Sequence, residues 1–334
     1  MTKKTATIIA VAERARVSPS TVSRVMNGRF TVDPVIADRV REAVKELQYS
    51  PNQRARSLVL GRTNTVAILV PDLGNPTFQS ILRGLTRAAA RDGFRVLVAD
   101  SAETAGDEAT LAAELRSRTD ALVLCAPRMP EPELALALDS LAPVVLINRD
   151  LSGVFAPILT VDYRAGIQPL AEHLYGLGHR RIVYLQGNVN SASNAYRLDG
   201  LAQFTAAHPD VDLIALDAGV TFEHGYAAAD SVLGSGATGC LCFNDLVAMG
   251  LLSALNERGV PVPGRLSLTG FDDITFARYT TPPLTTASVA VEQLGEDSWS
   301  RVYALISGES PDENVKVQPQ LEIRGSTGPV PIAR

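Results

Sequence analysis

The sequence predicts a small all-α domain at the N-terminus, followed by a larger α/β body of two lobes with parallel sheets and helices on both faces. Three observations lead to this prediction. The 334 residues are enough for two or three domains. Residues 1–62 hold 12 Lys/Arg and 5 Asp/Glu, whereas the rest of the chain holds 19 and 31. Helix signals fill the basic end, and short apolar runs alternate with helical stretches in the acidic remainder.

Composition excludes several classes of protein. The chain is 46% hydrophobic and 20% charged, which is ordinary for a globular protein. Its apolar runs all fall short of the roughly 18 residues that a membrane span needs. Three cysteines are too few for a disulfide framework, and the apolar run Thr5–Ala12 is too short for a signal peptide. We therefore expect a cytoplasmic protein without a membrane partner.

Residues 7–48 predict three short helices. The first covers Ile8–Ala15, whose apolar residues recur at helical spacing. The second begins with Pro19 behind Ser18, a residue suited to cap a helix, and the third repeats this pattern behind Asp33. A basic domain of this kind on an acidic body indicates contact with nucleic acid at that end only.

The second of these helices has an apolar face and a polar face. The apolar face carries Val22, Val25 and Met26. The polar face carries short hydroxyl side chains and one arginine: Ser20, Thr21, Ser23 and Arg24. Such side chains approach phosphates and base edges without crowding, so the pair of helices is interpreted as a helix-turn-helix that reads DNA. The alternative is a small helical bundle with a solvated face, which the basic charge disfavours.

Residues 51–62 follow as a short basic segment. Ser50 and Pro51 are a second helix start, but only about two turns precede Gly61, and so short a helix is marginal in water. The segment exposes Leu58 between basic residues. It is either a plain linker or a hinge helix that folds on DNA and wedges Leu58 into the minor groove.

The acidic body contains eight short apolar runs that read as buried parallel strands. They are Val66–Val70, Phe94–Ala99, Ala121–Cys125, Val144–Ile147, Ile182–Leu185, Leu213–Leu216, Cys240–Phe243 and Leu266–Thr269. Helical stretches over Thr77–Arg91, Ala105–Arg118 and Glu131–Leu141 separate the first four. Two consecutive sets predict two lobes, and ligands of such folds bind beyond the carboxyl ends of the strands.

Polar residues stand at these strand ends. Asn148, Asn244-Asp245 and Asp272-Asp273 each follow a strand, and Arg197 lies in a helix that follows another. Their side chains suit the binding of sugar hydroxyls, and Phe78 supplies an apolar face for a ring. Residues at such junctions often cap helices or form salt bridges instead, and we assign Asp245 and Asp273 such a structural role.

Cofactor and metal motifs are absent from the sequence. No Gly-x-Gly-x-x-Gly or Walker loop follows a strand, and the four histidines, His173, His179, His208 and His224, are scattered. Cys240 and Cys242 alternate to the same face of one strand, where buried structural thiols are expected. We expect neither a cofactor nor a metal, and no catalytic residues.

Several segments together resemble the LacI/GalR family of bacterial transcriptional repressors. They are TIIAVAERARVSPSTVSRVMNG, SPNQRARSL, VAILVPDLGNPTFQSILRGL, VDYRAG, LGHRRI, FNDLVAMG, GFDDI and TPPLTT, and they cover nearly the whole chain in order. The resemblance implies a DNA-binding domain, a hinge helix and an effector domain with the two-lobed fold of periplasmic binding proteins. The sequence departs from the family at the turn, where Arg16 replaces the usual glycine, and at Ala10, where an acidic residue is common.

The resemblance also implies roles for particular residues. Effector contacts are expected from Thr77, Phe78, Asn148, Arg197, Asn244 and Asp272. DNA contacts are expected from Thr7, Pro19, Ser20, Thr21, Ser23, Arg24, Asn27, Asn52, Ala55 and Leu58. Because many sugar-binding relatives have aspartate at the position of Asn148, the effector is expected to differ from the commonest hexoses.

The expected organisation has four parts. Residues 1–50 form the DNA-binding domain and 51–62 the hinge; 63–161 with 289–319 form the first lobe, and 162–288 with 320–334 the second. The chain is expected to form a homodimer on a near-palindromic DNA operator, under the control of a sugar or sugar derivative in the cleft. The alternatives are a regulator co-repressed by a purine or other metabolite, a periplasmic solute-binding protein and a cytoplasmic sugar-acting enzyme.

Overall fold

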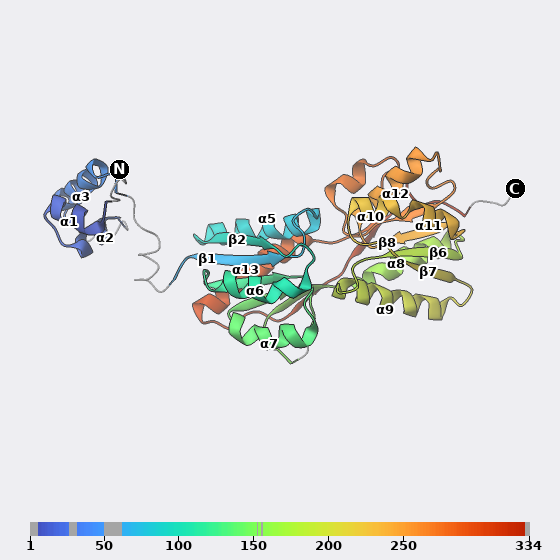
Figure 1. Ribbon diagram of the computed structural model, residues 1–334, viewed down its shortest axis with the longest axis horizontal. Coiled ribbons are helices and arrows are strands. Elements are labelled where there is room, and N and C mark those ends of the chain that lie inside the picture. The colour runs from blue at the N-terminus through green and yellow to red at the C-terminus, as the bar shows by residue number, and fades with distance from the viewer. Residues whose placement is uncertain (1–5, 27–31, 50–61, 152, 155, 331–334) are drawn as a thin grey trace. The chain divides into compact units, whose positions relative to one another are not determined.

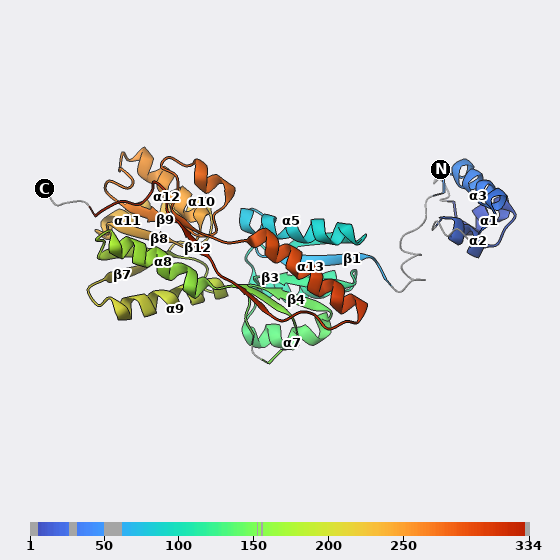
Figure 2. The same ribbon diagram turned by 180° about the vertical axis from the view of Figure 1, so that it is seen from behind.

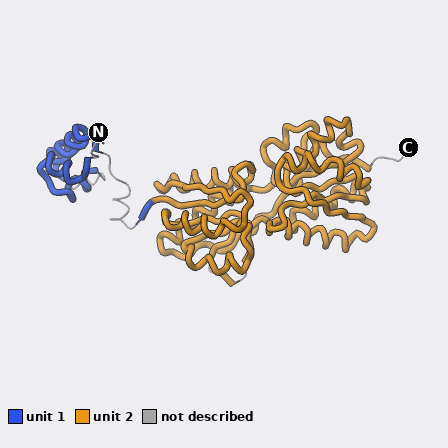
Figure 3. Tube along the Cα trace, in the orientation of Figure 1, with its two compact units in different colours: residues 1–63 blue, residues 64–334 orange. Residues whose placement is uncertain are grey.

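The chain forms two compact units, which Figure 3 colours separately: residues 1–63 and residues 64–334. In this computed structural model the described residues are 6–26, 32–49, 62–151, 153–154 and 156–330. The expected hinge, residues 51–62, therefore lies outside the described residues except for its last position. The two units are taken in turn.

The first unit contains the three predicted helices: α1 (Ile8–Ala15), α2 (Pro19–Met26) and α3 (Pro34–Glu46). Both predicted caps are confirmed, because Ser18 accepts a hydrogen bond from the Thr21 N–H and Asp33 accepts one from the Val35 N–H. The buried core is small and aliphatic: Val11, Ala12, Ala15, Val22, Val40 and Ala43. Met26, at the end of the apolar face of α2, is 36% exposed.

The first lobe of the larger unit is built on a six-stranded parallel sheet in the order β11-β5-β4-β3-β1-β2. Its strands are β1 (Thr65–Val70), β2 (Arg95–Asp100), β3 (Ala121–Cys125), β4 (Val144–Ile147), β5 (Ile158–Val161) and β11 (Val315–Val317). Its helices are α5 (Pro76–Arg91), α6 (Ala105–Arg116), α7 (Glu131–Leu141) and α13 (Val291–Ser307). Side chains alternate along the strands, so α5 and α13 cover one face and α6 and α7 the other (Figures 1 and 2).

The second lobe repeats this plan with four parallel strands in the order β7-β6-β8-β9. They are β6 (Arg181–Gln186), β7 (Asp212–Asp217), β8 (Gly239–Cys242) and β9 (Ser267–Thr269). Helices α8 (Tyr163–Gly176) and α9 (Ala192–Ala207) cover one face; α10 (Phe222–Ala227), α11 (Ala229–Gly234) and α12 (Asp245–Glu257) cover the other. A 3-10 helix, η1 (Thr275–Tyr279), follows β9.

The chain passes between the two sheets three times. Strand β5 leads into α8, and the short strand β10 (Thr286–Ser288) leads into α13, which packs against α5. Strand β11 then pairs with β5 before the chain continues to β12 (Gln320–Glu322). Strand β12 pairs antiparallel with β10 rather than with the four-stranded sheet of the second lobe.

Two strands differ from the sequence prediction. The runs at β2 and β7 were expected to be buried, but most of their residues are exposed or half-buried. Both strands lie at sheet edges, where one flank faces solvent. By contrast, the prediction for Cys240 and Cys242 is confirmed: both thiols are buried and free, with their sulfur atoms 3.8 Å apart.

Each lobe contains a close helix contact made by two glycines. In the first lobe Gly84 on α5 and Gly295 on α13 face each other, and a methyl group on either would overlap backbone atoms of the other helix. In the second lobe Gly225 on α10 and Gly250 on α12 do the same. Absence of a β-carbon therefore allows backbone-to-backbone packing in both lobes.

Among the described residues, no helix has the length and apolar character to cross a membrane. The described part of the chain also brings together no cluster of three or more His, Cys, Asp or Glu side chains that could hold a metal ion.

Candidate functional site

The candidate DNA-reading face is the polar side of α2. Ser20 and Arg24 are exposed, as is Pro19 at the start of the helix, while Thr21 and Ser23 are half-buried. The hydroxyl oxygen of Ser18 lies 2.7 Å from that of Ser20 and 2.9 Å from that of Thr21, so these three hydroxyls form one cluster at the helix N-terminus. Backbone N–H groups and hydroxyls at a helix start are suited to bind phosphate.

Of the remaining expected DNA contacts, one residue caps a helix and the other four lie outside the described residues. Thr7 caps α1, because its hydroxyl accepts a hydrogen bond from the Ala10 N–H at 3.3 Å. Asn27, Asn52, Ala55 and Leu58 lie outside the described residues. Their contacts with DNA stay predictions.

Arg16 adopts the left-handed backbone that the turn requires. Its φ of 54° and ψ of 51° end α1, and its N–H bonds to the carbonyls of Ala12 and Glu13. A side chain with a β-carbon costs about 1 kcal/mol in this conformation, where glycine would be free of strain. The turn therefore forms with the unusual residue, at a cost in stability.

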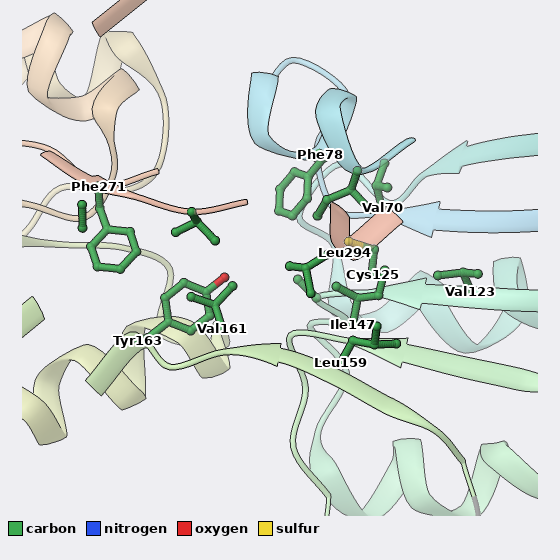
Figure 4. Close-up of a cluster of buried hydrophobic side chains, with 14 of the residues drawn as sticks. Val70, Phe78, Val123, Cys125, Ile147, Leu159, Val161, Tyr163, Phe271 and Leu294 are labelled. Atoms are coloured by element: carbon green, nitrogen blue, oxygen red, sulfur yellow. The ribbon is translucent and has the colours of Figure 1, made fainter. Parts of the chain in front are cut away.

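In the larger unit, an interlobe pocket lies beyond the carboxyl ends of the strands. The first lobe contributes Asn75, Thr77, Phe78, Glu103, Ala126 and Arg128. The second contributes Tyr163, Ser193, Arg197, Val220, Phe243 and Asp272. Figure 4 shows Phe78 from one lobe and Tyr163 and Phe271 from the other where the lobes meet. The cavity volume is about 30 Å³, room for one or two water molecules, so a larger ligand requires the lobes or side chains to move.

Arg197 lies at the centre of this pocket and is only 1% exposed. Its guanidinium carbon is 4.0 to 4.5 Å from the ring centres of Tyr163, Phe243 and Phe271. One nitrogen donates to the Ser193 carbonyl at 3.1 Å, but Nε is buried without a hydrogen-bond partner. A buried cation with an unused donor is costly to leave unpaired, and a polar ligand would supply the missing acceptor.

Asp272 is the carboxylate nearest to that guanidinium, with Oδ1 3.9 Å from Arg197 Nη2. Its other oxygen accepts a hydrogen bond of 2.9 Å from the Thr77 hydroxyl, which belongs to the opposite lobe. Burial raises the pKa of Asp272 to about 6, although Arg197 and Thr77 act in the opposite direction. The carboxylate is therefore charged at neutral pH but held with few partners.

Glu103 and Arg128 form a second ion pair in the pocket, which the sequence analysis missed. Arg128 Nε donates to one carboxylate oxygen at 2.6 Å and Nη2 donates to the other at 2.8 Å. Its remaining terminal nitrogen donates to the Ala126 carbonyl at 2.8 Å. Asn188, from the second lobe, donates to Glu103 at 3.1 Å. Both residues follow strand ends, the same signal that pointed to Asp272 and Asn244.

The buried carboxylate of Glu108 holds the backbone next to this ion pair in place. It accepts hydrogen bonds of 2.6 Å from the backbone N–H groups of both Arg128 and Met129. Burial raises the pKa of Glu108, while those two hydrogen bonds lower it. Glu108 therefore fixes the backbone from which the Arg128 side chain reaches the pocket.

Of the six expected effector contacts, Thr77, Phe78, Arg197 and Asp272 line the interlobe pocket, whereas Asn148 and Asn244 are not among its described lining residues. Asn148 accepts a hydrogen bond from the Val161 N–H at 3.1 Å. Asn244 accepts one from the Val247 N–H and donates to the carbonyl of Val220, a lining residue. Direct contact of these two asparagines with effector stays a prediction.

The salt-bridge role is confirmed for Asp273, whereas Asp245 has other structural contacts, because Asn244 caps α12 in its place. Asp245 is fully buried and accepts hydrogen bonds from the Ile274 N–H and the Thr286 hydroxyl. Asp273 pairs with Arg278 and Arg324.

Backbone strain concentrates around the pocket. Ala102, Glu103, Ala126, Asn148, Asp272 and Asp273 have φ values between 48° and 107°. All six follow the carboxyl end of a strand. Side chains rarely adopt such conformations, and strain of this kind gathers where a site must be held in place.

Comparison with known proteins agrees with this geometry. Residues 7–52 match "Bacterial regulatory proteins, lacI family", and residues 171–327 match "Periplasmic binding protein-like domain". The chain is 33% identical over 308 residues to the HTH-type transcriptional regulator GalR of Escherichia coli (strain K12), covering 90% of this chain and 89% of that protein.

Two solved structures are also similar. The lac repressor dimer bound to operator and the anti-inducer ONPF has a TM-score of 0.86 at 26% identity, covering 97% of this chain and all of that one. A LacI family transcriptional regulator from Enterococcus faecium, with bound ribose, has a TM-score of 0.71 at 26% identity, covering 80% and 99%. These relatives are regulators rather than enzymes, and the fold is that of the lac repressor. The chain therefore belongs to the LacI/GalR family of bacterial transcriptional regulators.

Proposed function

We propose that this protein is a repressor of a carbohydrate uptake or catabolic operon. It binds a near-palindromic operator as a homodimer and responds to a sugar or sugar derivative in the interlobe pocket. The observation that carries the proposal is Arg197, a buried guanidinium with an unused donor, beside Asp272 and three aromatic rings. Rings and paired polar groups of this kind suit the faces and hydroxyls of a sugar.

The relatives support both halves of the proposal. One solved relative is a repressor dimer on its operator, and another holds ribose. In this chain η1 exposes Phe276 and Tyr279, as expected of a surface that a second copy covers. The protein is proposed to act in the cytoplasm, on the nucleoid. The body is proposed to divide into residues 63–161 with 289–319 and residues 162–288 with 320–334.

The first experiment selects genomic fragments with the purified full-length protein at a stated salt concentration. Recovery of a near-palindrome beside transport or catabolic genes, with two chains per site, would support the proposal. Recovery only after addition of a metabolite extract would replace it with a co-repressor mechanism. Failure under both conditions would contradict DNA reading by the turn that contains Arg16.

Arg197→Ala is expected to abolish the effector response while operator affinity stays within about twofold of wild type, because Arg197 lines only the pocket. Operator-binding titrations with and without effector measure both quantities. A normal response in this variant would refute the pocket assignment.

Leu58→Ala is expected to weaken binding to the operator about tenfold or more, with little loss on unrelated DNA, since a wedge acts only at its own base step. Paired titrations on operator and scrambled duplexes at one salt concentration measure the difference. Equal loss on both duplexes would contradict the wedge role.

A further inference from the structure

Among the described residues, two hydrogen bonds join the lobes at the pocket, and a carboxylate accepts each of them. Thr77 of the first lobe donates to Asp272 of the second at 2.9 Å. In the reverse direction, Asn188 of the second lobe donates to Glu103 of the first at 3.1 Å. Both carboxylates line the pocket, so each lobe presents one to the same small space.

The Glu103 carboxylate retains capacity for a further hydrogen bond. A carboxylate accepts at about four lone-pair positions. Among the described residues, Arg128 uses one on each oxygen and Asn188 uses a second on Oε2. One acceptor position on Oε1 is left, and the side chain is 20% exposed, so a ligand in the pocket has access to it.

The backbone beneath this pair is strained, as it is at Asp272. Ala102 and Glu103 have φ values of 49° and 58°, and Ala126, just before Arg128, has 48°. An ordinary surface ion pair is worth little and needs no such conformation. Two consecutive left-handed residues with side chains indicate that the position of Glu103 is held at a cost in stability.

The charges of the pocket balance. Arg128 is matched by Glu103 through two short hydrogen bonds, and Arg197 is matched by Asp272 at longer range. An anionic ligand would add a buried charge with no free cation among the described lining residues except Arg197, which Asp272 already neutralises. A neutral ligand rich in hydroxyls preserves the balance and supplies donors to both carboxylates.

We propose that Glu103 is a specificity-determining residue of the pocket, whose carboxylate accepts a hydrogen bond from an effector hydroxyl opposite Asp272. Arg128 is its positioning residue. The pocket accordingly takes an uncharged polyhydroxy compound and excludes sugar phosphates and uronates. This inference rests on the proposed function, in which the effector occupies this pocket.

The test titrates the full-length protein calorimetrically with a defined panel. The uncharged members are D-ribose, D-glucose and D-galactose; their anionic counterparts are ribose 5-phosphate, glucose 6-phosphate and galacturonate. Wild type is expected to bind at least one uncharged member, and to bind its anionic counterpart at least about 100-fold more weakly. Glu103→Gln is expected to weaken that binding about 10- to 100-fold, as for loss of a hydrogen bond to a charged group.

Glu292→Gln is the matched control. Glu292 also pairs with arginines of the first lobe, accepting from Arg83 at 2.7 and 3.1 Å and from Arg87 at 2.6 Å, but it does not line the interlobe pocket. Its affinity for the panel should equal that of wild type. Operator binding and the unfolding midpoint identify variants that fail to fold. If Glu103→Gln fails to fold, Glu103→Asp is tested in its place.

Deoxy analogues of the bound sugar distinguish contact from a structural role. The analogue that lacks the hydroxyl donating to Glu103 should bind wild type weakly. Its affinity should fall no further in Glu103→Gln. Arg128→Met should abolish the effect of the same hydroxyl, and Arg128→Lys should restore part of it. A purely structural defect would weaken all analogues equally, which would overturn the inference.

The remaining outcomes separate the two proposals. If Asp272→Asn loses binding while Glu103→Gln binds like wild type, the inference fails and the pocket assignment stands. If both variants bind like wild type, the pocket assignment itself fails. If wild type binds an anionic member as tightly as its uncharged counterpart, the ligand class is wrong. If wild type binds no panel member, the inference about ligand class is overturned, and the repressor proposal is judged by the operator titrations.

Discussion

The interlobe pocket contains two arginine–carboxylate pairs that differ in how completely they are bonded. Arg128 and Glu103 share two hydrogen bonds of 2.6 and 2.8 Å, whereas Arg197 and Asp272 come no closer than 3.9 Å. Both arginine side chains are almost fully buried. The two arginines are therefore buried alike, and the hydrogen bonds distinguish the pairs: Arg128 holds its carboxylate in place, whereas Arg197 keeps a donor without an acceptor.

The difference follows from what each arginine packs against. Arg128 donates to the Ala126 carbonyl and to both oxygens of the Glu103 carboxylate. Arg197 lies among aromatic rings, which attract its charge but leave Nε without an acceptor. Predictions that break or sharpen this comparison follow, from the largest effect to the smallest.

Breaking the pair with the shorter hydrogen bonds, Arg128–Glu103, should cost the most stability. Arg128→Met is expected to lower the free energy of unfolding by about 3 kcal/mol, since it leaves the Glu103 carboxylate without its cation. Arg197→Met is expected to cost about 1 kcal/mol or less, because Asp272, whose pKa burial already raises to about 6, takes up a proton when its cation is removed. Urea unfolding of the two variants at pH 7.5, followed by circular dichroism, measures both changes. Equal losses of unfolding free energy would contradict the proposed difference in bonding between the two ion pairs.

Asp272→Asn should stabilise the protein in a pH-dependent way. Because burial raises the pKa of Asp272 to about 6, ionisation costs stability that grows from the ordinary pKa of aspartate up to about pH 6 and is constant above it. The variant is expected to exceed wild type by about 1–3 kcal/mol at pH 7.5, with the difference shrinking as the pH falls to 5. Thermal unfolding across this range measures it.

The adjacent aspartate is the control for that experiment. Burial raises the pKa of Asp273, but hydrogen bonds from Arg278 and Arg324 outweigh it, so the net shift is downward. Its contribution to stability is present above the ordinary pKa of aspartate and is lost only at lower pH. Asp273→Asn should therefore destabilise by a constant amount between pH 5 and 7.5. The same pH dependence in both variants would contradict the assignment.

The smallest effect concerns the strained backbone next to the Arg128–Glu103 pair. Ala102→Gly is expected to stabilise by about 0.5 kcal/mol, because relief of the positive φ exceeds the entropy that glycine adds to the unfolded chain. Arg16→Gly in the smaller unit should give a gain of similar size. Ala113→Gly, at an exposed position within α6, should instead cost about 1 kcal/mol. Destabilisation by Ala102→Gly would show that the loop is not strained.

The sequence predicted much of this arrangement from local signals. Proline behind a capping residue located the starts of α2 and α3, and apolar runs located the strands of both sheets. Four of the six expected effector residues line one pocket. Glu103 and Arg128 were missed because nothing local distinguishes a buried pair from a solvated one; burial there depends on the opposite lobe.

The sequence also could not predict the direction in which the side chains at the strand ends point. Asn148 and Asn244 stand at strand ends as expected, but a left-handed backbone at Asn148 and the cap at Asn244 direct their side-chain oxygens toward backbone N–H groups. Exposure of β2 and β7 depends on strand order, which alternation of strands and helices does not determine.

The reciprocal glycine contacts have a mechanical consequence. Helices locked backbone to backbone at Gly84 and Gly295 cannot slide past each other, and the same holds at Gly225 and Gly250. We therefore expect each lobe to move as a rigid body, so that a displacement of Thr77 at the start of α5 moves α13 with it. The three connecting segments then act as hinges. A ligand that separates the pocket walls is expected to rotate one whole lobe against the other instead of shifting a few side chains.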